Sequence, residues 1–217
     1  MAFDKELVAA KLRRWEKYLR EYRLPEWDRL PDLGLYMEQV TVLMRQYLDY
    51  LPPELKEEQF ITASTINNYV RMKIMPEPRR KRYYRIHLAY LIVILTLKQS
   101  LSISVVSKII PMNIPEAEVR EIYDDFVMRH RSLCRLCTEQ VKQLAADVFD
   151  LNRKDDAAVK HLVVESAIYS HLYKLLTEKI VALSIEPKPE PVPEADTSPE
   201  PLTAAVQEEN KVENLAE

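Results

Sequence analysis

Hydrophobic side chains recur every three or four residues along most of the chain, with charged residues between them. This period predicts amphipathic helices, and we therefore expect an all-α protein. The expected helices cover 3–23, 35–50, 86–97, 115–151 and 157–183. Prolines separate several of these segments, as expected for a residue that lacks a backbone donor and clashes with the preceding helical turn.

A shorter helix is expected to begin at Thr62 or Ser64, where a side-chain hydroxyl can accept from the free amides of the first turn. Pro76 and Pro78 are expected to end it. One side of this helix is apolar and would face the core, and its residues are Ile66, Tyr69 and Val70. The other side carries a polar stripe at positions i, i+3, i+4 and i+7, formed by Ser64, Asn67, Asn68 and Arg71.

A basic cluster follows the polar stripe. From Arg71 to Arg85 there are seven basic residues and one acid, which gives a net charge of +6 over 15 residues. Within it, Arg79–Tyr84 is expected to form a short hairpin wing. A recognition helix, a basic wing and an apolar supporting helix, in this order, are typical of a winged helix-turn-helix.

Five short runs also resemble a bacterial family of unknown function over roughly residues 30–115. They are Leu35-Tyr36-Met37-Glu38-Gln39-Val40, Ile66-Asn67-Asn68-Tyr69-Val70, Pro76, Lys81-Arg82-Tyr83-Tyr84-Arg85 and His87-Leu88-Ala89-Tyr90-Leu91. That family is similar in turn to the DNA-binding domain of MerR-type transcription regulators. The resemblance implies a MerR-like winged helix-turn-helix and a sequence-specific regulator that binds double-stranded DNA.

In this interpretation the polar stripe enters a major groove, since Asn can read adenine and Arg can read guanine. Ser64 and Thr65 would hold phosphates, and the wing would clamp the backbone beside them. The expected DNA-binding residues are Ser64, Thr65, Asn67, Asn68, Arg71, Lys73, Arg79, Arg80, Lys81, Arg82, Tyr84 and Arg85. The alternatives are a solvated helix face and, for the basic cluster, a solvated loop. Tyr69 is expected to belong to the core, and Tyr84 fits either role.

The alternative function is a protein-interaction adaptor, in which the basic loop docks an acidic partner and the C-terminal helices serve assembly. Residues 184–217 contain nine acids and two lysines, a net charge of −7, so this segment could also compete with DNA for the basic cluster. A homodimer is expected, because two-fold symmetry doubles the contacts on a palindromic site. Whether a small-molecule effector exists is left open.

The chain offers little for catalysis. Its single glycine, Gly34, excludes the glycine-rich loops that cradle phosphates or dinucleotides. None of the four histidines belongs to a recognisable pair of nucleophile and base, so we expect neither an enzyme nor a cofactor. His130, Cys134 and Cys137 share a helical face and could hold a soft metal. Free cysteines are more often core filling, and no metal site is expected.

The expected organisation has four parts: an N-terminal helix and loop (1–34), the DNA-binding domain (35–112), a helical hairpin for dimerisation or an effector (113–184), and a disordered acidic tail (185–217). The longest apolar run, 86–97, is too short to span a bilayer, and the N-terminus lacks a signal-peptide pattern. We therefore expect a cytoplasmic protein with no membrane partner.

Overall fold

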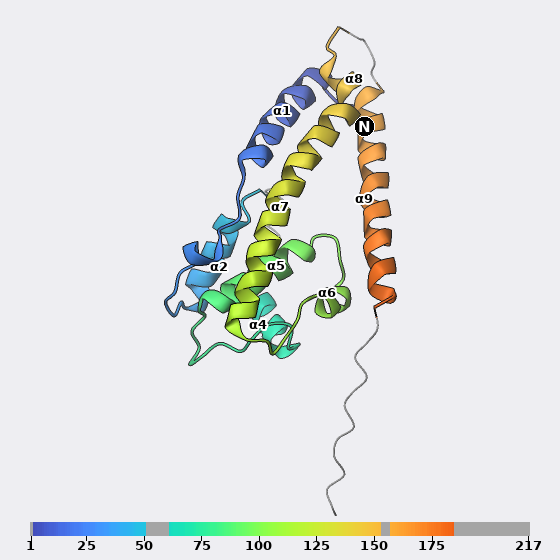
Figure 1. Ribbon diagram of the computed structural model, residues 1–217. Coiled ribbons are helices and arrows are strands. Elements are labelled where there is room, and N and C mark those ends of the chain that lie inside the picture. Colours follow the sequence, from blue (N-terminus) through green and yellow to red (C-terminus); the bar gives the residue numbers. More distant parts are fainter. Residues whose placement is uncertain (1, 51–60, 153–156, 185–217) are drawn as a thin grey trace, which may run out of the picture. The chain divides into compact units, whose positions relative to one another are not determined.

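The computed structural model describes residues 2–50, 61–152 and 157–184, and these are helical apart from loops and two isolated β-bridges (Figure 1). The expected all-α class is confirmed. The expected disordered tail at 185–217 lies outside the described residues.

Helices are present over each of the expected ranges, and the one expected over 115–151 is divided into two. The elements are α1 (Lys5–Glu21), η1 (Trp27–Arg29), α2 (Met37–Tyr47), α4 (Ala63–Arg71), α5 (Arg85–Leu97), α6 (Ile103–Ile109), α7 (Glu116–Leu144), α8 (Ala146–Phe149) and α9 (Ala158–Ala182). Within the described ranges, no helix has the length and apolar character needed to cross a bilayer.

Side-chain caps fix where three helices begin. Asp4 accepts from the amide of Leu7 at the start of α1, at 3.0 Å. The hydroxyl of Thr62 accepts from the amide of Thr65 at 3.1 Å, which selects Thr62 over Ser64 as the cap of α4. Ser102 caps α6 in the same way. Each cap satisfies an amide that has no partner inside its own helix.

Helix α5 is the centre of the main core. Eight of its 13 residues are buried, and α2 and α7 pack against it. The surrounding cluster of buried side chains runs from Tyr22 to Val127 and includes Ile66 and Tyr69 of α4. Tyr69 is therefore a core residue, as expected. The apolar face of α4 thus holds it against the core and leaves its polar face outward.

Helix α4 ends before the prolines that were expected to stop it. Lys73 adopts a left-handed conformation with φ of 56°. Its amide donates to the carbonyl of Val70, and the amide of Ile74 donates to that of Tyr69. These two hydrogen bonds form a Schellman motif, in which a left-handed residue ends the helix by satisfying its last carbonyls. The expectation about Pro76 and Pro78 was therefore wrong.

The long helix expected over 115–151 is interrupted at Ala145, which is fully buried. The chain bends there into α8, and this places Val148 in a second, smaller core with Ala9 of α1 and Val159 of α9. The bend at Ala145 thus accounts for the difference from one straight helix, since it directs Val148 into this cluster. Contacts with α8 and α6 hold α9.

Gly34 lies where the loop before α2 meets the segment before α5. A Cβ atom at this position would lie 2.8 Å from Cδ and 3.0 Å from Cβ of Arg82, and 3.1 Å from the ring of Tyr84. Antiparallel hydrogen bonds between Leu35 and Tyr83, of 2.8 and 2.9 Å, close the same junction. The one glycine of the chain is thus required by close approach between two segments.

Gly34→Ala is predicted to lower the free energy of unfolding by about 1–2 kcal/mol, because the added methyl group overpacks this junction. Urea denaturation of the single variants and of Gly34→Ala with Arg82→Ala would measure the coupling. We expect the penalty of Gly34→Ala to shrink when Arg82 is shortened, since Cδ is the nearest atom. Strictly additive losses would show that Arg82 does not set the requirement for glycine.

Candidate nucleic-acid interface

The polar face of α4 lines a shallow surface hollow of about 840 Å³. All four residues of the predicted stripe line it, together with Lys98 at the end of α5 and Ile103 at the start of α6. The lining residues are Thr62, Ser64, Thr65, Asn67, Asn68, Tyr69, Arg71, Lys98 and Ile103. Lys98 is the C-cap of α5, and sequence reasoning missed it because only the packing of α4 brings the end of α5 beside the stripe.

Charge in this hollow is of one sign. Among the described residues that line it, Arg71 and Lys98 are the charged ones, and neither is an acid. Arg71 donates to the side-chain oxygen of Asn68 at 2.7 Å, and the amide group of Asn68 approaches Met72. Asn68 is therefore oriented by its neighbours, whereas Asn67 is exposed. The surface combines amide groups and cations, the side chains that read base edges in a major groove.

The basic cluster forms a tight turn. The amide of Arg82 donates to the carbonyl of Arg79 at 3.0 Å, and Arg80 and Lys81 between them have φ values of 50° and 62°. Two central residues with positive φ are characteristic of a type I′ turn, the common connection of a β-hairpin. Among the described residues the pairing is limited to isolated bridges, so the expected wing hairpin is not confirmed.

Arg79, Arg80 and Lys81 are exposed at this turn, but Arg82 is engaged within the molecule. Its guanidinium donates to the carbonyl of Gly34 at 3.1 Å and to the hydroxyl of Tyr36 at 2.7 Å. The same group lies 4.3 Å from the centre of the Tyr36 ring, a cation–π distance. These contacts fasten the turn to the loop before α2.

Arg85, the first residue of α5, is also held by contacts within the molecule. It donates to the carbonyl of Leu30 at 3.2 Å, lies 3.7 Å from a carboxylate oxygen of Asp32, and approaches the ring of Trp27. Tyr84 is the N-cap of α5 and is half-buried. Three of the predicted DNA-binding residues, Arg82, Tyr84 and Arg85, thus make contacts that position the turn.

His87 fixes the start of α5 from inside the core. Its Nδ1 accepts from the amide of Tyr84 at 3.0 Å, which makes Nε2 the protonated nitrogen that donates to the carbonyl of Glu77 at 3.0 Å. Burial lowers the pKa of His87, and the ring is held neutral with both nitrogens satisfied. This histidine connects the segment before the basic turn to α5.

The structure places His130 close to one of the two cysteines. The Sγ of Cys134 lies 3.6 Å from Nδ1 of His130, whose ring packs against Tyr22 and Tyr50. Burial lowers the pKa of His130 and raises those of both Cys134 and Cys137, which disfavours the thiolate that binds metals. Within the described part of the chain, no three His, Cys, Asp or Glu side chains are grouped closely enough to hold an ion.

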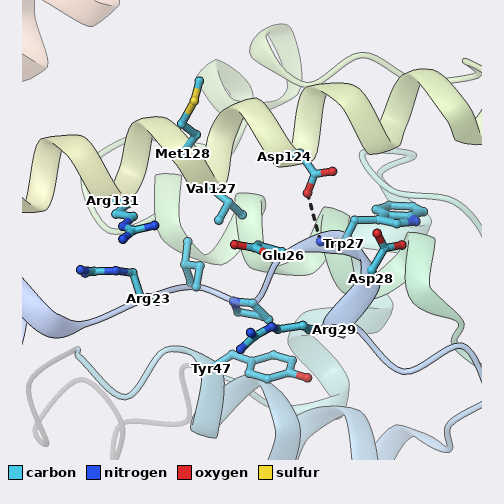
Figure 2. Close-up of a pocket in the computed structure, with 12 residues that line it drawn as sticks. Arg23, Glu26, Trp27, Asp28, Arg29, Tyr47, Asp124, Val127, Met128 and Arg131 are labelled. Atoms are coloured by element: carbon cyan, nitrogen blue, oxygen red, sulfur yellow. Dashed lines mark hydrogen bonds between the residues drawn. The ribbon is translucent and has the colours of Figure 1, made fainter.

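A second polar cleft, of about 780 Å³, lies between the 23–29 segment, α2 and α7 (Figure 2). Arg23 and Arg131 lie toward one end, and Asp28 and Asp124 toward the other. Asp124 accepts from the amide of Trp27 at 3.0 Å, so its position serves to dock the loop on α7. The described residues that line it include no histidine, cysteine or serine.

Acid is predicted to destabilise the fold below about pH 6.5, the usual pKa of an unfolded histidine. Because the folded pKa values of His87 and His130 are both lowered, the unfolded chain binds more protons between the two values. Their contribution is therefore complete above pH 6.5 and is lost as the pH falls toward the folded pKa. The urea concentration at the midpoint of unfolding should therefore decrease as the pH is lowered from about 6.5 to about 5.

His130→Phe removes one of the two titrating groups while keeping an aromatic ring in the same pocket. The variant should retain part of the pH dependence, which then belongs to His87. A midpoint that does not change from pH 8 to pH 5 in the unmodified protein would contradict the prediction.

Residues 25–126 match the Domain of unknown function (DUF1836). No curated protein and no solved structure shows significant similarity to the chain. The match confirms the expected likeness to a family of unknown function, and nothing in it supports the further likeness to MerR-type regulators. Its limits nearly coincide with the buried cluster from Tyr22 to Val127, and they include both the α4 hollow and the basic turn. The segment 25–126 is therefore similar to the DUF1836 family.

Proposed function

We propose that the protein is a cytoplasmic, sequence-specific DNA-binding transcription regulator of the MerR-like winged type, with double-stranded DNA as its partner. The observation that carries the proposal is the hollow on α4. It gathers hydroxyl, amide and cationic side chains on one exposed helix face, and none of the described residues that line it is an acid. Phosphates repel carboxylates, so an acid-free polar face suits a nucleic-acid surface.

In this mechanism α4 lies in the major groove. Its nine residues give a helix about 14 Å long, comparable with the width of the groove. Asn67, Asn68 and Arg71 are the base-reading candidates, and Asn68 is already oriented by Arg71. Ser64, Thr65 and Lys98 at the border of the hollow would contact phosphates.

The basic turn would hold the backbone. Arg79, Arg80 and Lys81 are exposed and available for phosphates, with Lys73 nearby in the chain. The turn precedes the first residue of α5 and the hollow borders its last, so the two surfaces lie about 20 Å apart along this helix. That separation lets one duplex meet both. Arg82, Tyr84 and Arg85 are assigned positioning roles in this proposal because of their internal contacts.

A homodimer remains part of the proposal, since two copies of α4 would read a palindromic site.

The protein-interaction adaptor remains the alternative, and the exposed apolar residues of α9 are the observation that favours it. In that case the basic turn would bind an acidic protein surface, and DNA binding would be absent even at low salt.

Arg79→Ala with Arg80→Ala is predicted to weaken binding to every DNA sequence alike. Losing two phosphate contacts should reduce the slope of log affinity against log salt by up to about 2 units. Fluorescence anisotropy with a random-sequence duplex, titrated at several salt concentrations, measures both quantities. Lys11→Ala with Lys17→Ala, on the exposed side of α1, removes the same charge and should leave the slope unchanged.

Equal salt slopes in the turn variant and the unmodified protein would remove the turn from the mechanism. Equal reductions in the turn variant and the α1 control would mean that overall charge, and not this turn, governs binding.

Asn68→Ala is predicted to relax sequence preference, with a loss of about 1–3 kcal/mol of discrimination at one base position. Selection of bound sequences from a random pool would show that position becoming degenerate while the rest of the motif persists. Asn152→Ala, an exposed asparagine far along the chain, is the matched control and should enrich the unmodified motif. An unchanged motif in Asn68→Ala would exclude this residue from base reading.

A further inference from the structure

Helix α9 is apolar on most sides, yet its middle is uncovered. Every residue from 163 to 176 is exposed, and only Ala158 and Val159 of the whole helix are buried. Ten large apolar side chains from here to the C-cap each remain 47–68 % exposed. They are Val163, Val164, Ile168, Tyr169, Leu172, Tyr173, Leu175, Leu176, Ile180 and Leu183.

This exposed surface is large for a protein that stays monomeric. Ten such half-exposed side chains present on the order of 800–1,000 Å², whereas monomers rarely expose a continuous apolar patch of more than about 600 Å². A stable interface buries about 800 Å² on each partner. One α9 helix therefore presents about the area that a stable association requires.

A second apolar strip lies on α7. Ile122, Leu133 and Leu136 are 42–60 % exposed, and the half-buried Phe126 lies on the same side of the helix. The strip begins at an apolar groove of about 260 Å³ between α5, the end of α6 and α7. Figure 1 shows α9 standing apart from α7 along most of its length. The two strips thus do not cover one another.

The rest of the chain is poorly suited to cover these surfaces. Residues 185–217 carry nine acids and two lysines, and their only large apolar residues are Ile185, Val192, Leu202, Val206, Val212 and Leu215. Six scattered aliphatic residues without an aromatic cannot match ten that are grouped on one helix. A cover of comparable length and apolar density is required.

The pattern on α9 fits a second copy of the same helix. Leu162, Tyr169, Leu176 and Leu183 recur every seven residues, and Tyr173 and Ile180 lie between them at alternating spacings of four and three. Seven-residue apolar repeats are the pattern by which helices pair along their length. The helix has three lysines and two glutamates, so it carries no strong charge that would select an acidic or basic partner.

We propose that two copies of the protein associate about a two-fold axis through α9. Each α9 packs along the α9 of the partner and against the partner's α7 strip, which gives a bundle of four helices. A two-fold arrangement covers both strips on both copies at once, because the same surface serves each subunit. The dimer does not depend on DNA binding, and its test is made without DNA.

The test compares the mass of the full-length protein and its variants by light scattering after gel filtration. The unmodified protein should have twice the 25.5 kDa mass of one chain. Leu172→Glu with Leu176→Glu should weaken association by at least about 100-fold and give a monomer with unchanged helix content by circular dichroism. Leu133→Glu with Leu136→Glu should weaken it as well, through the α7 strip.

His171→Glu with Lys174→Glu is the matched control. Both residues lie on the narrow polar side of α9 with Lys160 and Glu178, so this variant should remain dimeric. Should the Leu→Glu pair fail to fold, Leu172→Ala with Leu176→Ala should still raise the dimer dissociation constant about 10-fold or more.

A monomeric unmodified protein would overturn the proposal, and so would a dimer that the α9 variants leave intact. The unmodified protein could instead be a monomer that binds lipid vesicles, with binding lost in the Leu172→Glu, Leu176→Glu variant. That result would overturn the proposal and assign α9 to a membrane surface. A dimer in which only the α7 variant has no effect would overturn the four-helix arrangement. Dimerisation without DNA binding would refute the proposed function and leave this inference standing.

Discussion

A helix that is apolar on every side must be surrounded, and α5 meets this requirement within a single chain. Its side chains fill the core between α2 and α7, and the loops around it are anchored to its ends. Tyr84 and His87 at its start hold the basic turn, and Lys98 at its end borders the hollow on α4. Burial of one 13-residue helix therefore sets both the position of the two candidate surfaces and the distance between them.

Helix α9 has a broad apolar side, and this side is not covered within one chain. Within one chain its contacts are with α8 and α6, and its middle turns remain open. The matched domain ends at residue 126, before α9 begins, so the covered core and the uncovered helix belong to different parts of the chain. The matched domain buries its apolar side chains within one chain, whereas α9 does not. This arrangement is expected when α9 serves association with another molecule. The proposed dimer applies to α9 the constraint that already explains α5.

Features set by neighbouring residues could be predicted from the sequence, and features set by packing could not. The helices, a hydroxyl cap at Thr62 or Ser64 and the buried position of Tyr69 follow from spacing and local hydrogen bonding, and the structure selects Thr62. The left-handed end of α4 at Lys73 has no sequence signal, because glycine or asparagine normally occupies that position. Arg82 and Arg85 could not be separated from their exposed neighbours, since the carbonyls they bind lie 48 and 55 residues away. Lys98 was missed for the same reason.

The scarcity of glycine bears on the basic turn itself. Arg80 and Lys81 occupy left-handed backbone conformations that cost most residues roughly 1–2 kcal/mol and cost glycine almost nothing. Glycine or asparagine at these positions would make the same type I′ turn with less strain. The chain instead places two cations there, and a third, Lys73, at the strained end of α4. A solvated loop gains nothing from charge at strained positions, whereas a surface that binds phosphates needs these side chains. Strain at three cations therefore favours a polyanionic ligand over a purely structural turn.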